Sequence, residues 1–182
     1  MQWIIPGTTL EGQRENADRI DGLMQSLFLA GGLTLSQVSS ITGLEAYTIQ
    51  NWVKRGFLSP PRNKRYDMEQ LCRILNINIL KGNMPLEQIV KLMTYLNGNL
   101  VDESDDLVDD TQLYFLFVKL AARARYIGGT KAWDDALVEI TEDFEEPVPG
   151  AREKLIKVLK VMLTTWCANM LKMHADAMMA EM

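Results

Sequence analysis

The chain has 182 residues, of which 47% are hydrophobic and 24% are charged, as in ordinary globular proteins. No apolar run reaches the roughly 18 residues that a membrane-spanning helix needs, and the first residues lack the basic segment of a signal peptide. Cys72 and Cys167 are too few and too far apart for a disulfide framework or a zinc site. We therefore expect a soluble cytoplasmic protein with no membrane partner.

The charge is unevenly distributed along the chain. Residues 45–81 hold seven Lys and Arg against three Asp and Glu, a net charge of +4, whereas the whole chain carries −5. The remaining residues therefore carry −9. A basic island on an acidic protein can confine DNA contact to one face, although chance clustering would give the same count.

Apolar residues at helical spacing predict a first helix over 16–29, which Gly31 and Gly32 end. The segment Thr34–Gln37 is typical of a capping box and predicts the start of a second helix. Gly43 is placed to end that helix.

A short amphipathic helix with a cationic end is predicted from about 45 to 55, and Gly56 ends it. Pro60, Pro61 and Asn63 then predict a short hairpin, or wing, at 57–66. The side of this unit that faces the core is expected to hold Ile49, Trp52, Val53, Phe57 and Leu58.

Helices are also predicted at about 67–76, 85–96, 112–127, 133–144 and 151–182, with Asp67 as a cap, Pro85 in a first turn, and Gly128 and Gly129 as a stop. Between the second and third of these, Asp102 to Asp110 holds six acidic residues in nine positions. This run predicts a solvated linker that favours the start of the next helix. An acidic DNA mimic or a metal site is the alternative.

The last predicted helix carries an apolar stripe. Seven positions from Leu155 to Ala177 recur about every 3.7 residues, closer to a straight helix than to the 3.5 repeat of a coiled coil. At about 1.5 Å per residue the helix is longer than a domain of this size needs. We expect part of the stripe, including Met162 and Met170, to pack against a second copy. Packing within its own bundle is the alternative.

The run Ile49 to Leu58 resembles the recognition-helix exit of the MerR family, in which an Ile-Arg-Tyr start leads to Gly-Leu-Leu and Pro. Arg65-Tyr66 is similar to the Arg-x-Tyr that closes that family's wing, without the spacer residue. The segment Leu86–Ile89 resembles its later Leu-Glu-Glu-Ile element. Gln50 stands where the family usually has Arg, which removes a backbone-contacting cation. The chain also resembles an uncharacterised bacterial family with such a head and a helical C-terminal body.

The resemblance implies an all-α protein. It would comprise a winged helix-turn-helix head with a small two-stranded wing, and a C-terminal helical bundle with a long last helix. We predict an N-terminal arm and helix at 1–32, the head at 33–100, an acidic linker at 101–110, and a helical dimerisation or effector domain at 111–182.

A helix and wing of this kind suit double-stranded DNA, because a helix fits the major groove and cations reach phosphates. Gln and Asn can pair with the major-groove edge of adenine. The candidate DNA-binding residues are Tyr47, Thr48, Gln50, Asn51, Lys54, Arg55, Arg62, Lys64 and Arg65.

We predict a DNA-binding transcriptional regulator that forms a homodimer through its C-terminal helices. An adaptor protein whose degenerate winged helix recruits a protein partner is the alternative, and an architectural DNA-bending protein of the excisionase type is a third. Cys167 and His174 make only an incomplete metal pair, and no phosphate loop or nucleophile motif occurs. We therefore expect no enzyme activity, no cofactor and no metal. The sequence indicates no particular small-molecule effector.

Overall fold

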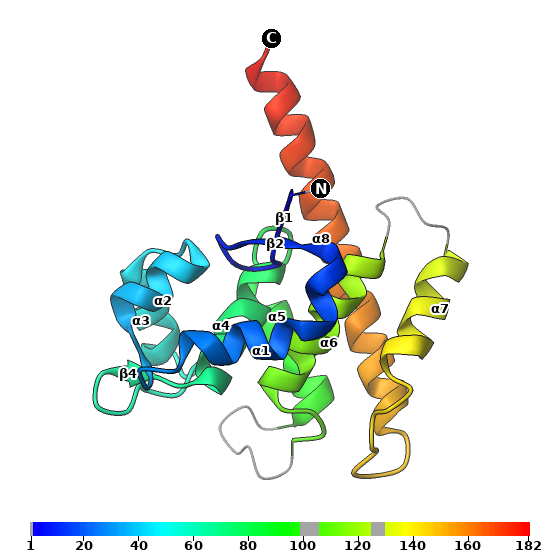
Figure 1. Ribbon diagram of the computed structural model, residues 1–182, viewed down its shortest axis with the longest axis horizontal. Helices are drawn as coiled ribbons and strands as arrows, with labels where there is room; N and C mark the ends of the chain where they lie inside the picture. Colours follow the sequence, from blue (N-terminus) through cyan, green and yellow to red (C-terminus); the bar gives the residue numbers. More distant parts are fainter. Residues whose placement is uncertain (1, 99–105, 125–129) are drawn as a thin grey trace.

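The computed structural model describes residues 2–98, 106–124 and 130–182, and this part of the chain is mostly helical with two small two-stranded sheets (Figure 1). The strands are β1 (Gln2–Ile4), β2 (Glu11–Gln13), β3 (Leu33–Thr34) and β4 (Arg65–Tyr66). The helices are the 3-10 helix η1 (Arg14–Arg19) and the α-helices α1 (Ile20–Leu27), α2 (Leu35–Thr42), α3 (Ala46–Lys54), α4 (Met68–Leu80), α5 (Leu86–Asn97), α6 (Asp110–Arg123), α7 (Thr130–Ile140) and α8 (Ala151–Ala180).

Helix α4 lies at the centre of the fold. Ten of its 13 residues are buried, because it packs against α2, α5, α6 and α8. Asp67 begins it with a capping box, accepting from the Gln70 amide at 2.9 Å while the Gln70 side chain accepts from the Asp67 amide at 3.1 Å. The helix was predicted to end near Asn76 but continues to Leu80, since the Asn76 side chain bonds to Asp110 and does not compete with the helix backbone.

The N-terminal arm is a β-hairpin, which the sequence did not predict. Strands β1 and β2 pair antiparallel, and η1 and α1 follow where one continuous helix from residue 16 was expected. The arm is fixed to α6, because the Tyr114 hydroxyl donates to the Pro6 carbonyl at 3.0 Å. Gly7, with a φ of 77°, lets the arm approach α4, since a Cβ there would lie 2.9 Å from the Leu75 carbonyl oxygen.

Residues 57–66, the expected two-stranded wing, contain a single β-strand, β4. This strand pairs antiparallel with β3, which precedes α2, and the other arm of the segment contributes a single bridge between Arg62 and Arg65. Pro60 and Pro61 have no amide hydrogen, so this arm cannot continue a hydrogen-bonded ladder.

The last residue of the predicted acidic linker, Asp110, is not solvated. The Asp109 side chain caps α6, accepting from the Gln112 amide at 2.8 Å, whereas Asp110 is only 4% exposed. Residues 101–105 lie outside the described residues. The predicted glycine stop at 128–129 also lies outside them, and α6 itself ends at Arg123.

Helix α8 has a buried part and an exposed part. Along its first half, the stripe positions Leu155, Leu159, Met162 and Trp166 are buried within the protein's own bundle. Every residue from 171 onward is exposed, and Figure 1 shows this end of α8 extending beyond the other helices. The expectation that Met162 contacts a second copy is therefore wrong, because its side chain is fully buried. The predicted helix at 133–144 is α7, which ends at Ile140, and Pro85 precedes α5 as its N-cap residue.

Candidate nucleic-acid interface

Helices α2 and α3 are joined by the short segment 43–45. The Thr34 hydroxyl accepts from the Gln37 amide at 3.3 Å and the Gln37 side chain accepts from the Thr34 amide at 2.9 Å, which confirms the predicted capping box. Gly43 ends α2 with a φ of 68°, the left-handed conformation that a glycine adopts without strain. The Ser39 hydroxyl donates to the Leu44 carbonyl, so the turn into α3 is tied to α2.

Helix α3 has one buried face and one open face. Ile49 and Trp52 are 0% and 5% exposed, which confirms that both belong to the core. Val53 and Phe57 are partly buried, and Leu58 is buried. On the opposite face four predicted contact residues are exposed and Thr48 is half-buried; the exposed ones are Tyr47, Gln50, Asn51 and Lys54.

The segment after α3 ends in a tight hairpin. Asn63 and Lys64 have φ angles of 50° and 61°, and the Arg65 amide donates to the Arg62 carbonyl at 2.9 Å. Two central residues with positive φ are the mark of a type I′ turn, for which Asn is a favoured residue. The turn places Arg62, Lys64 and Arg65 on the surface.

The segment that leads into the hairpin is hydrogen-bonded to the first turn of α4. The Gln70 side chain donates to the Ser59 and Pro60 carbonyls at 3.0 and 3.1 Å, and it also forms part of the α4 capping box. A shallow groove separates the hairpin from α3 and is lined by Leu35, Gln50, Val53, Pro61, Lys64 and Tyr66. The structure therefore brings Gln50 and Lys64 to the same groove.

Two of the predicted DNA-binding cations, Arg55 and Arg65, already make contacts within the protein. Arg65 donates from Nη1 to the Gly32 carbonyl at 2.6 Å, so it also fixes β4 against β3. Arg55 lies 3.5 Å from Glu87 of α5 and 4.7 Å from the centre of the Phe57 ring. Both arginines remain exposed, but these contacts reduce what they can contribute to a partner.

The basic island is smaller on the surface than in the sequence. Arg73 is one of its seven cations, yet it is 8% exposed and bonds to Asp110, Nε to Oδ2, at 2.5 Å. Without Arg73, residues 45–81 present six cations against three acidic residues, a net of +3. The cations that face solvent are Lys54, Arg55, Arg62, Lys64, Arg65 and Lys81.

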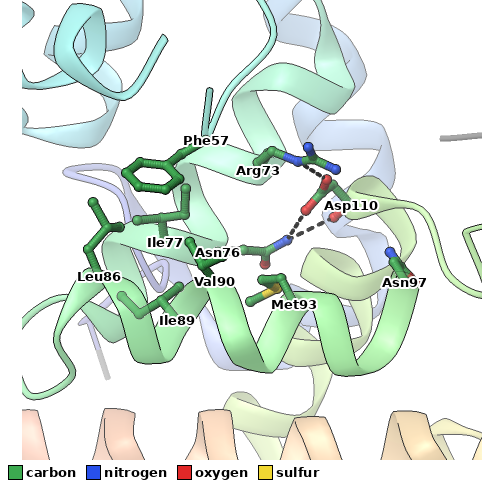
Figure 2. A pocket seen from close by; sticks show the side chains of 10 residues that line it. All are labelled: Phe57, Arg73, Asn76, Ile77, Leu86, Ile89, Val90, Met93, Asn97 and Asp110. Atoms are coloured by element: carbon green, nitrogen blue, oxygen red, sulfur yellow. Dashed lines mark hydrogen bonds and ion pairs between the residues drawn. The ribbon is translucent and has the colours of Figure 1, made fainter. Parts of the chain in front are cut away.

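Arg73 instead belongs to a buried polar junction between α4 and α6 (Figure 2). Asn76 donates to the Asp110 carbonyl and carboxylate at 3.1 and 3.2 Å. Burial raises the pKa of Asp110, while the Arg73 guanidinium and the Asn76 amide oppose that rise. No sequence pattern indicated this junction, because its partners are 37 residues apart.

The junction closes one end of a cavity between α4 and α5. Figure 2 shows Phe57, Ile77, Leu86 and Val90 around it, and the Asn76 oxygen on the side of Met93. The cavity volume is about 20 Å³, which is room for a single water-sized molecule. This cavity is therefore a packing feature and no site for a larger ligand.

The remaining predicted features are the possible metal pair Cys167 and His174 and the absence of a membrane span. Cys167 is buried and His174 is exposed. Within the described ranges, no three His, Cys, Asp or Glu side chains are grouped so that they could hold a metal ion. None of the helices that the structure describes is both long and apolar enough to cross a membrane.

Residues 27–117, from the end of α1 into α6, match the family described as Domain of unknown function (DUF1836). This segment is half of the chain. The chain belongs to the DUF1836 family. The matched segment contains α2, α3, the hairpin, and both sides of the Arg73–Asp110 junction.

The DUF1836 chain is also similar to the "Uncharacterized protein YkrK" of Bacillus subtilis (strain 168), with 30% identity over 84 residues. The alignment covers 44% of this chain and 36% of YkrK, so the chain spans only about a third of that relative. No solved structure matches the chain.

Proposed function

We propose that this DUF1836 protein is a transcriptional regulator of MerR-like type, and that it binds duplex DNA through α3 and the 62–65 hairpin as a winged helix. The observation that carries the proposal is the open face of α3 beside a cationic turn. Gln50 and Asn51 supply groups for base edges, and Lys54, Arg62 and Lys64 supply cations for phosphates.

Charge distribution supports this choice of face. The protein carries a net charge of −5, so duplex DNA is repelled on average and its binding needs a locally cationic face. Residues 45–81 supply such a face, with a surface excess of three positive charges. The resemblance of residues 49–58 to the recognition-helix exit of the MerR family points to the same face.

We also propose that the protein pairs with itself through the exposed end of α8. Leu171, Met173, Met178 and Met179 are between 48% and 67% exposed on a helix that extends away from the bundle. A two-fold symmetric dimer would then present two copies of α3 and the hairpin to an inverted-repeat DNA site.

The proposal is tested with the full chain, because α4 packs against α6 and α8 and a fragment ending near residue 100 would lose that packing. Fluorescence anisotropy at low salt would measure binding to a pool of random duplexes. The triple variant Lys54→Ala, Arg62→Ala, Lys64→Ala should bind at least about tenfold more weakly.

A matched control removes three cations elsewhere. Lys131, Lys154 and Lys157 are exposed on α7 and the first half of α8, so their substitution by Ala gives the same change of net charge. The affinity of this control variant for DNA should stay within about twofold of that of the original protein. Equal losses in both triple variants would contradict the proposed face, and no duplex binding by the unaltered protein would favour the adaptor alternative.

A further inference from the structure

The open face of α3 divides into a neutral part and a cationic part. Tyr47, Gln50 and Asn51 lie in the first two turns of the helix, and their exposed side chains carry no formal charge. Lys54 is the last residue of α3, and further cations follow on the 62–65 hairpin. The neutral part therefore lies toward the start of the helix, and the cationic part lies at its end and on the hairpin.

The two parts suit different components of duplex DNA. In recognition helices that lie in the major groove, N-terminal residues contact base edges, whereas Lys and Arg side chains mostly neutralise phosphates. Guanine is the base that Arg and Lys select most often. Residues 46–53 contain neither Arg nor Lys, so this part of α3 has no side chain that selects guanine in that way.

Gln50 and Asn51 favour adenine instead. A carboxamide carries an acceptor and a donor side by side, and adenine presents the matching N6 donor and N7 acceptor in the major groove. The other three bases do not offer this pair of groups there. Within the described part of the chain neither side chain forms a hydrogen bond, so no protein group competes with a base for the two amides.

We propose that the DNA site selected by α3 contains two A·T base pairs, whose adenines are recognised in the major groove by the carboxamides of Gln50 and Asn51. The inference rests on the proposed function and adds the bases that the same face selects. Lys54 and the hairpin cations then fix the helix on the phosphates without specifying a base.

The preferred site is found by selecting bound duplexes from a random pool with the full chain and sequencing them. It should contain two A·T positions at which G·C weakens binding about fivefold or more, the effect of one well-placed bidentate pair. Gln50→Ala should remove the preference at one position, and Asn51→Ala at the other. The matched control is Gln88→Ala, which removes the same group from an exposed position on α5 and should keep both preferences.

A modified base separates contact with adenine from a preference for the shape of A·T-rich DNA. 7-Deazaadenine keeps its pairing with thymine and its minor-groove edge but lacks the N7 acceptor. At either position it should weaken binding by the unaltered protein about threefold or more, because one amide donor loses its partner. It should have no effect on the variant that lacks the corresponding amide.

Circular dichroism confirms that each variant is folded before affinities are compared. A selected site without the two A·T positions would overturn this inference while duplex binding itself stands. Preferences for A·T that 7-deazaadenine and both variants leave unchanged would overturn it in the same way. If the unaltered protein selects no duplex, the proposed function fails and this inference fails with it.

Discussion

Arg73 on α4 and Asp110 on α6 form an ion pair of 2.5 Å in which both residues are more than nine-tenths buried. The pair joins the central helix of the matched segment to the helix that follows the predicted linker. Asn76 adds two hydrogen bonds to the same aspartate. Helices α4 and α6 are therefore joined by a buried polar contact inside the core.

Removal of one member of this pair should be strongly destabilising. Asp110→Ala leaves Arg73 buried without its carboxylate partner, and we expect the free energy of unfolding to fall by about 3–5 kcal/mol. The double variant Arg73→Met, Asp110→Leu should recover most of that loss, since two apolar side chains need no partner. Urea denaturation measures both variants, and a loss below about 1 kcal/mol in Asp110→Ala would show that the pair is not structural.

The turn at Asn63 and Lys64 allows charge and conformation to be separated. Lys64→Gly removes a cation but favours the left-handed conformation that Lys64 already has, so the hairpin should be unchanged or more stable. Duplex binding should nevertheless weaken about two- to fivefold at low salt. Asn63→Gly favours the same turn without a change of charge, and its binding should stay the same. Undiminished binding by Lys64→Gly would argue against a phosphate contact there.

The exposed end of α8 predicts which substitutions disrupt a dimer. Met173→Glu combined with Met178→Glu should convert a particle of twice the 20.7 kDa chain mass into a monomer, with little effect on the melting temperature. Met162→Glu should instead unfold the protein, because that side chain is fully buried. Sedimentation equilibrium distinguishes the two results. A concentration-independent monomer mass for the original protein would remove the basis for pairing.

The two cysteines should be unreactive in the folded protein. Cys72 and Cys167 are 0% and 5% exposed, and burial raises the pKa of both thiols. At pH 8 we expect neither to react with a disulfide reagent at the rate of a free cysteine, whereas concentrated urea should expose both. Rapid reaction of either thiol in the folded state would indicate an opening of the core that the structure does not show.

Local sequence signals predicted much of the helical framework. The capping residues Thr34 and Asp67 and the stop at Gly43 lie where they were expected, because capping depends on neighbouring residues only. The helical spacing of apolar residues also predicted which face of α3 is exposed. Thr48 is a partial exception, because it is half-buried.

Features that depend on distant partners could not be predicted in this way. The β1–β2 hairpin has strands of three residues, too short for a reliable alternating pattern. Arg73 and Asp110 looked like parts of a basic island and an acidic linker, because nothing local distinguishes a buried charge from a solvated one. The pairing of β4 with β3 likewise joins segments more than 30 residues apart.

The salt dependence of duplex binding tests the central claim most directly. Affinity of the full chain for a bound duplex would be measured across a range of KCl concentrations, for the original protein and for the two triple lysine and arginine variants. Each lost phosphate contact lowers the steepness of the logarithmic plot by about 0.9. The variant at Lys54, Arg62 and Lys64 should therefore have a slope shallower by about 2–3, and the control variant an unchanged slope. Identical slopes for all three proteins would contradict DNA binding through α3 and the hairpin.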